Sequence, residues 1–253
     1  MENLISLTNL SPWQFWICVL VIFLAGMVRG FSGFALSALV MASLVIFLPP
    51  IELIVICWFL EMSASLLMVR DGIRRWDRSV VIGLVVGSSI GAPIGLYLTN
   101  TMPVETSKMI ALLVILVLAA LQLLKVRATF LATRSGVYFS GLTAGIVTGL
   151  ASVGGMVVAL YVLARESPAK VMRGSLVMFL FVSGLLTFIY MNMYGMFEGQ
   201  VVRGLLWSPV CMLGVLAGQA LFRPRLEPYY KPFCLCLLIA LAAVGLIRMG
   251  LAA

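Results

Sequence analysis

The sequence predicts an all-α integral membrane protein, and three observations lead to this prediction. Hydrophobic residues make up 63% of the 253 residues and charged residues only 10%, whereas soluble domains are about half apolar and a quarter charged. The mean hydropathy is +1.16. Apolar segments follow one another along the chain, and no polar stretch is long enough for a soluble domain. We therefore expect a single membrane domain with about eight transmembrane helices and up to ten helical segments.

Ten apolar segments are separated by short polar, proline-containing or glycine-rich stretches. Several are shorter than the roughly 20 residues that cross the hydrocarbon core. The first and second segments, and the sixth and seventh, form short adjacent pairs that are each joined at a glycine-rich break. This pattern is typical of a hairpin made from a broken helix. The segments cover residues 13–29, 31–47, 51–69, 79–98, 106–124, 136–150, 153–164, 169–194, 200–222 and 229–250.

The two halves of the chain resemble each other when one is shifted onto the other by 119 residues. Under this shift Gly26 aligns with Gly145, and Pro49 aligns with Pro168. Glycine and proline matches count most because these residues mark backbone geometry. We therefore predict two copies of one five-segment unit, each a broken-helix hairpin followed by three spanning helices. The two units cover residues 1–125 and 126–253.

The positive charges predict how the chain is oriented. Thirteen of the 17 lysines and arginines fall in four regions that the order of segments places on one side of the membrane. By the positive-inside rule this side is cytoplasmic, so we expect both termini on the extracytoplasmic side of the inner membrane. Because the unit has an odd number of segments, its second copy has inverted topology. The four regions are 70–78, 125–135, 165–173 and 222–231.

The composition argues against several other functions. The net charge is +8, but the cations lie in short loops, so we expect no nucleic-acid partner. Histidine is absent, and the five cysteines lie in apolar segments without metal-ligand spacing, so we expect no metal and no cofactor. The sequence contains no phosphate-binding loop and no nucleophile motif, so we do not expect an enzyme.

The two breaks, RGFSGFA and TGLASVGGM, are candidate anion sites. Where a helix resumes, its first N–H groups have no partner within the helix, and in hydrocarbon such groups must line a cavity or bind something. A cluster of N–H donors and serine hydroxyls suits an oxyanion. The alternative is tight helix packing by glycine, which we favour for Gly26 and Gly145. The substrate-binding candidates in the breaks are Gly30, Ser32, Gly33, Ser152, Gly154 and Gly155.

Four further residues could complete such a site. Arg29 directly precedes the first break and Arg173 lies early in a later segment. A planar guanidinium suits an oxyanion, although either arginine could instead extend to the membrane interface. Ser175 could face the same cavity or bond to its own helix. Glu61, deep in a segment, could carry a coupling proton, pair with an arginine, or be neutral and hydrogen-bonded.

The breaks and their surroundings resemble the sulfite exporter TauE/SafE family. AGMVRGFSGFA, later followed by PP, and AGIVTGLASVGGM, later followed by SP, are similar to the family's two glycine-rich motifs, and GAPIG in the fourth segment also fits. The resemblance covers nearly the whole chain. It implies a membrane permease with two inverted halves that moves sulfite, sulfonates or related sulfur anions. The first motif departs from the family at residues 34–36, where glycines often follow.

We therefore expect transport, and in particular export, of a small sulfur oxyanion such as sulfite or a short organosulfonate. The anion would be held at helix N-termini between the two repeats. A proton-coupled importer of a sulfur-containing anion, with Glu61 as the coupling group, is one alternative, and a membrane scaffold that transports nothing is another. The expected partners are the anion and membrane lipid, and a homodimer is left open.

Overall fold

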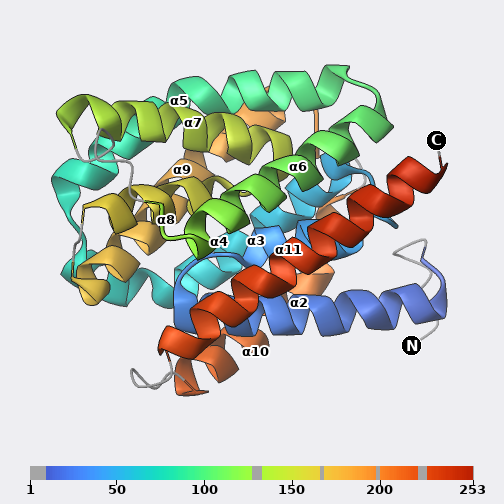
Figure 1. Ribbon diagram of the computed structural model, residues 1–253, viewed down its shortest axis with the longest axis horizontal. Coiled ribbons are helices and arrows are strands. Elements are labelled where there is room, and N and C mark those ends of the chain that lie inside the picture. The colour runs from blue at the N-terminus through green and yellow to red at the C-terminus, as the bar shows by residue number, and fades with distance from the viewer. Residues whose placement is uncertain (1–9, 127–132, 166–167, 198–199, 222–226, 253) are drawn as a thin grey trace.

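The computed structural model describes residues 10–126, 133–165, 168–197, 200–221 and 227–252. These residues form ten helices and no strand (Figure 1). Seven of the described helices are long and apolar enough to cross a membrane, and residues 135–151 form a shorter apolar helix. The prediction of an all-α integral membrane protein is therefore confirmed. The helices are α2 (Pro12–Ser32), α3 (Leu36–Leu44), α4 (Pro50–Arg75), α5 (Arg78–Thr101), α6 (Val104–Leu123), α7 (Arg134–Ala151), α8 (Gly154–Ala164), α9 (Ala169–Met193), α10 (Val201–Leu221) and α11 (Glu227–Ala252).

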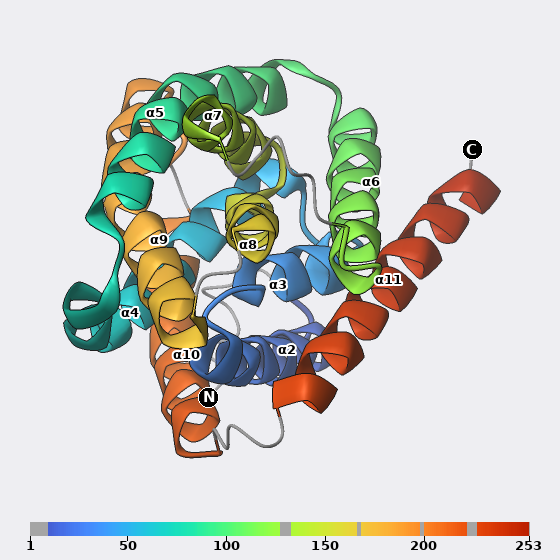
Figure 2. The same ribbon diagram turned by 60° about the vertical axis from the view of Figure 1, so that its left-hand side comes forward.

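Two of the helices, α3 and α8, are too short to cross a membrane. They contain 9 and 11 residues, and at a rise of about 1.5 Å per residue they are about half as long as the hydrocarbon core is thick. Figure 2 shows both near the centre, surrounded by the longer helices. Eight of the nine residues of α3 are buried. The predicted broken hairpins are therefore present, as α2–α3 and α7–α8.

The helix bounds differ from the predicted segments at the first break. The segment predicted to end at residue 29 continues to Ser32, and the one predicted for 31–47 is helical only over Leu36–Leu44. Gly30 stays helical because it is a packing residue: a Cβ there would lie 2.3 Å from the carbonyl oxygen of Val215 in α10. The chain leaves the helix at Gly33, whose φ of 82° is in the left-handed region.

Local signals in the sequence account for several helix starts. Ser11 and Gln14 form a capping box at α2. The Asp77 side chain accepts a hydrogen bond from the Val80 N–H at 3.2 Å and caps α5. Prolines precede α4, α6 and α9 as their N-cap residues, where the lack of an N–H donor causes no loss inside the helix.

Two pairs of helices pack with their backbones in direct contact, α5 with α7 and α2 with α10. A Cβ at Gly91 of α5 would lie 2.1 Å from the carbonyl oxygen of Leu142 in α7, and one at Gly218 of α10 would lie 2.0 Å from that of Met27 in α2. Glycine therefore permits the approach of the helices. At Gly26 and Gly145 a Cβ would lie 2.5 Å from a backbone oxygen of the partner helix, which confirms the packing interpretation of both.

The helix contacts occur in matching sets. If α2 to α6 are placed in order against α7 to α11, then the α5–α7 contact corresponds to the α10–α2 contact, and the α5–α9 contact corresponds to the α10–α4 contact. Two further contacts, α4–α9 and α6–α11, each join corresponding helices. In these matching contacts a helix of one half packs against a helix of the other half, as two related halves would produce. The division at residues 1–125 and 126–253 stays a prediction.

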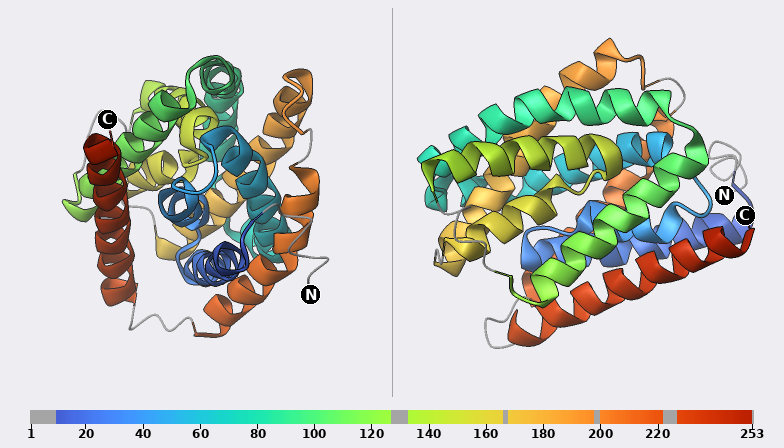
Figure 3. Two further views of the ribbon diagram at one scale, coloured as in Figure 1. Left: turned by 90° about the vertical axis from the view of Figure 1, so that its right-hand side faces the viewer. Right: turned by 45° about the horizontal axis from the view of Figure 1, so that its top comes forward.

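The helix ends that border the cation-rich regions lie at one end of the molecule. Helices α4, α6, α8 and α10 end, and α5, α7, α9 and α11 begin, toward the end opposite the two termini (Figures 1 and 3). The described lysines and arginines of these regions therefore lie away from the termini, and which side of the membrane they face stays a prediction. Some of these cations, at 127, 223 and 225, lie outside the described residues.

Leucine at position 91 should disrupt the α5–α7 contact. Because the nearest atom is backbone and cannot rotate away, Gly91→Leu is expected to lower stability by about 1–3 kcal/mol or more. Thermal unfolding of the purified protein in detergent would measure the loss. Gly250→Leu is the matched control, since no atom lies within 4 Å of a Cβ at that position. Equal melting temperatures for the two variants would contradict the packing role of Gly91.

Candidate functional site

The first break is a tight bend in which the Ser32 hydroxyl contacts the backbone of the break itself. The Gly33 N–H donates to the Arg29 carbonyl oxygen at 2.9 Å, and Ala35, at the N-cap of α3, has a φ of 73°. Such a conformation is strained for alanine. Ser32 Oγ lies 2.8 Å from the carbonyl oxygens of Val28 and Phe34. The hydroxyl of Ser32, which the sequence predicts to bind ligand, is therefore engaged by carbonyl groups of the break.

Arg29 is the centre of a buried polar network that joins α2 to α4. Its side chain is fully buried. The Nε atom lies 3.3 Å from Oε2 of Glu61, and Nη2 donates to Ser65 Oγ at 3.1 Å. Nη1 donates to the carbonyl oxygen of Gly33. Among the alternatives that the sequence left open for Arg29 and Glu61, the structure has the two residues paired, and Arg29 does not extend to the interface.

The Glu61 carboxylate is held at the start of α3. Its Oε1 accepts a hydrogen bond from Ser37 Oγ at 2.8 Å and lies 3.4 Å from the Ser37 backbone nitrogen, in the first turn of α3. The N-terminus of a helix carries unpaired N–H groups and the positive end of the helix dipole. The carboxylate therefore occupies the kind of position that the sequence predicts for a ligand anion.

The two facing atoms of the ion pair lack hydrogen-bond partners. Both Arg29 Nε and Glu61 Oε2 are buried and have a charge contact but no hydrogen bond. The two side chains also differ in access, since 0% of the Arg29 side chain is exposed and 14% of the Glu61 side chain. The pair is therefore electrostatically matched but incompletely hydrogen-bonded, and Glu61 is the more exposed of its two side chains.

Arg173 of α9 brings a second guanidinium to the first break. Its Nη2 donates to the carbonyl oxygen of Gly30. Its Cγ would lie 3.0 Å from a Cβ at Gly33, so the arginine stem packs directly on the bend. Two arginines from different helices, α2 and α9, thus meet the same turn of chain. The structure thus brings together two of the predicted site residues that are 144 positions apart in the sequence.

Ser175 and Gly30 occupy different surroundings from the other candidates. Ser175 is buried, and its Oγ accepts a hydrogen bond from the Asp77 N–H at 3.0 Å, which secures the turn between α4 and α5. The Cα of Gly30 is closed off by the α10 backbone, so only its carbonyl oxygen takes part in the break. The structure does not bring Ser175 to the Arg29 network.

The second break also bends at a left-handed residue, but it contains one such residue where the first break contains two. Ser152, which aligns with Gly33, has a φ of 57°, and its N–H donates to the Thr148 carbonyl oxygen at 2.8 Å. A Cβ at Gly154 would lie 2.0 Å from Thr148 Oγ1, and one at Gly155 would lie 3.3 Å from the Leu180 methyl carbons. Both glycines therefore pack closely on neighbouring groups of the protein.

The polar network itself is not repeated. At the offset of 119 residues the four polar positions of the first half align with Thr148, Met156, Leu180 and Gly184 in place of Arg29, Ser37, Glu61 and Ser65. Thr148 Oγ1 donates to the Ala144 carbonyl oxygen at 2.7 Å, within its own helix. The Arg29–Glu61 network therefore belongs to the first half of the chain, and Arg173 is the charged residue that the second half brings to the same break.

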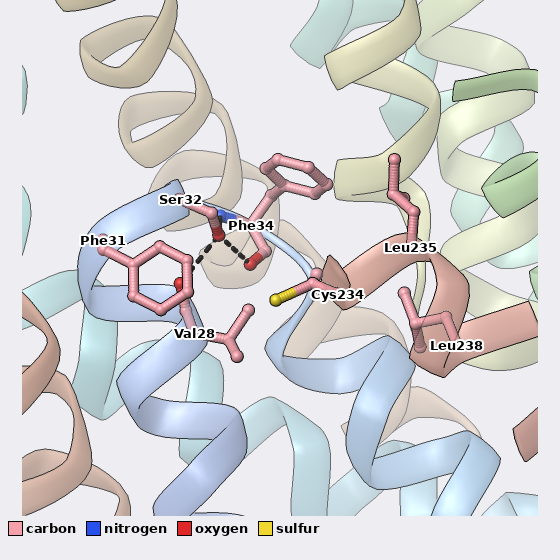
Figure 4. Close-up of a pocket in the computed structure, with 8 residues that line it drawn as sticks. Val28, Phe31, Ser32, Phe34, Cys234, Leu235 and Leu238 are labelled. Carbon is pink, nitrogen blue, oxygen red and sulfur yellow. Dashed lines mark hydrogen bonds between the residues drawn. The ribbon is translucent and has the colours of Figure 1, made fainter. Parts of the chain in front are cut away.

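A narrow pocket lies between the first break and α11 (Figure 4). Its volume is about 10 Å³, about the space for one water molecule. Figure 4 shows Val28 and Phe31 on one side and Cys234, Leu235 and Leu238 on the other. A sulfur oxyanion does not fit there, so the break is closed on this side. A larger pocket, about 730 Å³, lies between the start of α6 and the end of α11.

These features define a class of protein. A polytopic helical membrane protein with two broken helices and buried arginines at one break has the architecture of a secondary transporter. The chain belongs to the sulfite exporter TauE/SafE family, whose family model matches residues 18–245. The resemblance drawn from the glycine-rich motifs is thereby confirmed. No curated protein and no solved structure matched the chain. The family assignment implies a membrane permease for sulfur anions.

Breaking the buried ion pair should destabilise the protein more than removing it whole. Arg29→Met or Glu61→Leu alone leaves one buried charge unpaired and is expected to cost about 3–5 kcal/mol, whereas the double variant should be close to wild type. Denaturation of the three purified variants in detergent would measure these differences. A double variant whose loss equals the sum of the two single losses would show that the charges do not interact.

Proposed function

We propose that the protein exports a small sulfur oxyanion, such as sulfite or a short organosulfonate, across the inner membrane. The observation that carries this proposal is the position of the Glu61 carboxylate. A negatively charged group of the protein lies between a buried arginine and the first turn of a broken helix. Groups that hold a carboxylate oxygen are of the same chemical kind as those that hold the oxygens of sulfite or a sulfonate.

Several residues at the first break would bind the anion together. Arg29 would supply planar N–H donors that suit an oxyanion, and Ser37 would supply a hydroxyl and a backbone N–H from α3. Arg173 would bring a second positive charge from α9. Ser32 and Gly33 would shape the bend. We assign to the second break, with Ser152, Gly154 and Gly155, the role of a matching hinge whose N–H groups line the anion path.

The direction of transport follows from electrostatics. Outward movement of an anion is favourable in an inside-negative cell by about 2.3 kcal/mol per charge at 100 mV. An exporter therefore needs no strong coupling to another ion. The cation-rich end of the molecule would face the cytoplasm, where its lysines and arginines would also raise the local concentration of anions.

A proton-coupled importer is the second candidate function, and the observation that favours it is a membrane carboxylate inside the candidate site. In that case Glu61 would exchange a proton as the anion binds. An imposed pH gradient, inside alkaline or inside acidic, would then change sulfite flux in proteoliposomes at constant voltage. Flux that follows voltage alone supports the exporter, and flux that follows the pH gradient alone supports the importer.

Arg173→Ala should reduce sulfite efflux at least about tenfold, because the variant removes a charge-assisted contact. Efflux from sulfite-loaded proteoliposomes would be measured at fixed voltage, with sulfate, thiosulfate and sulfoacetate as competing anions. Arg70→Ala is the matched control, since Arg70 is an exposed arginine in the C-terminal part of α4. Wild-type efflux in Arg173→Ala would remove Arg173 from the site. A wild-type protein that moves none of these anions would support the membrane-scaffold alternative.

A further inference from the structure

We infer that Glu61 is a built-in competitor of the transported anion: its carboxylate occupies the anion-binding groups when the site is empty, and substrate binds by displacing it. This inference rests on the proposed function and adds to it a determinant of affinity and release. Glu61 then acts as a positioning residue that holds the empty site together, and not as a ligand of the anion.

The first argument is that one carboxylate engages both kinds of donor at once. One of its oxygens lies 3.3 Å from Arg29 Nε, and the other lies 2.8 Å from Ser37 Oγ. Two oxygens of a sulfur oxyanion would need these same donors on α2 and α3. Both occupants carry negative charge, so they would repel each other in the low-dielectric interior. Simultaneous occupancy is therefore disfavoured, and binding becomes an exchange.

The second argument is that the existing pairing is incomplete. Arg29 is fully buried, yet its Nε donor has no hydrogen-bond partner, and neither has the facing Oε2 of Glu61. An unsatisfied buried donor costs free energy that a better-placed acceptor recovers. Because Glu61 is tied to the α4 backbone, its carboxylate cannot adjust as a free anion can. The network therefore holds its own carboxylate less well than it could hold a diffusible oxyanion.

The third argument concerns access and movement. The Glu61 side chain keeps 14% of its surface exposed while Arg29 keeps none, so an entering anion would meet Glu61 before Arg29. The element that closes the site, α3, has only nine residues and begins at a strained alanine, Ala35. A short helix next to a strained bend can move by small backbone rotations. Displacement of Glu61 and movement of α3 can thus occur together.

The charges are consistent with an exchange. Arg29 and Arg173 bring two guanidinium groups to the first break, and Glu61 brings one carboxylate. A bound monoanion would replace the Glu61 carboxylate beside Arg29, and Glu61, once displaced, would still lie near Arg173 at the same turn. The corresponding positions of the second half carry Thr148 and Leu180 in place of Arg29 and Glu61. The exchange is therefore confined to one break.

The test is the affinity of the purified full-length protein for sulfite, measured by calorimetric titration. Glu61→Gln keeps the size and the hydrogen-bonding capacity of the side chain but removes its charge, and it should bind sulfite at least about tenfold more tightly than wild type. Glu52→Gln is the matched control, because Glu52 pairs with Arg203 at 2.5 Å away from the break. Its affinity for sulfite should equal that of wild type.

Two further variants keep the inference testable if Glu61→Gln folds poorly. Glu61→Asp retracts the carboxylate by one methylene and should bind sulfite about threefold more tightly than wild type. Adding Arg29→Gln to Glu61→Gln should abolish the gain. In proteoliposomes the tight-binding variants should also release sulfite more slowly, so that maximal efflux falls while half-saturation shifts to lower sulfite concentration.

The outcomes separate this inference from the proposed function. If wild type binds and transports sulfite but Glu61→Gln and Glu61→Asp bind it equally or more weakly, Glu61 is not a competitor and the exporter proposal stands. If neither wild type nor any variant binds sulfite or the other sulfur anions, the proposed function fails, and the competitor role fails with it.

Discussion

The buried guanidinium of Arg29 is the constraint around which the rest of the site is arranged. A charge inside a membrane helix bundle has to be compensated, and Arg29 obtains compensation from two elements, the α2 bend and α4. Ser37 of α3 in turn holds the Glu61 carboxylate. Breaking α2 at Gly33 frees a carbonyl group and lets α3 begin close to the Glu61 carboxylate. The break at Gly33, the short helix α3 and Glu61 thus act together to stabilise the buried charge of Arg29.

Rigid and adjustable regions are distributed unequally in this molecule. Where α5 meets α7 and α2 meets α10, backbones touch at glycines, and almost any side chain would be too large. The two short helices lie between these pairs and are surrounded on all sides (Figure 2). Packed interiors resist continuous deformation, so movement during transport is expected where the packing contains short elements and bends, and not in the glycine contacts.

Much of the fold was predictable from the sequence, but only part of the site. Composition and segment order were sufficient for the helical membrane class, and glycine with proline spacing located both breaks, because these signals are local. Ser37 was missed since its role depends on Glu61, 24 positions away. Gly30 and Ser175 were expected to bind ligand, yet their neighbours are distant in the sequence, Val215 of α10 for Gly30 and the N-cap residue Asp77 for Ser175. No local pattern encodes such contacts.

The exchange of helix partners between the halves has a consequence for how the protein is made. Helix α2 ends at Ser32, but its partner α10 begins only at Val201. At about 5–20 residues per second, the ribosome needs roughly 10–30 s to synthesise the chain between them. During that interval the glycine face of α2 lacks its partner helix, although Arg29 can already pair with Glu61 of α4. Insertion machinery or a lipid-facing chaperone would have to shelter the nascent first half until the second arrives.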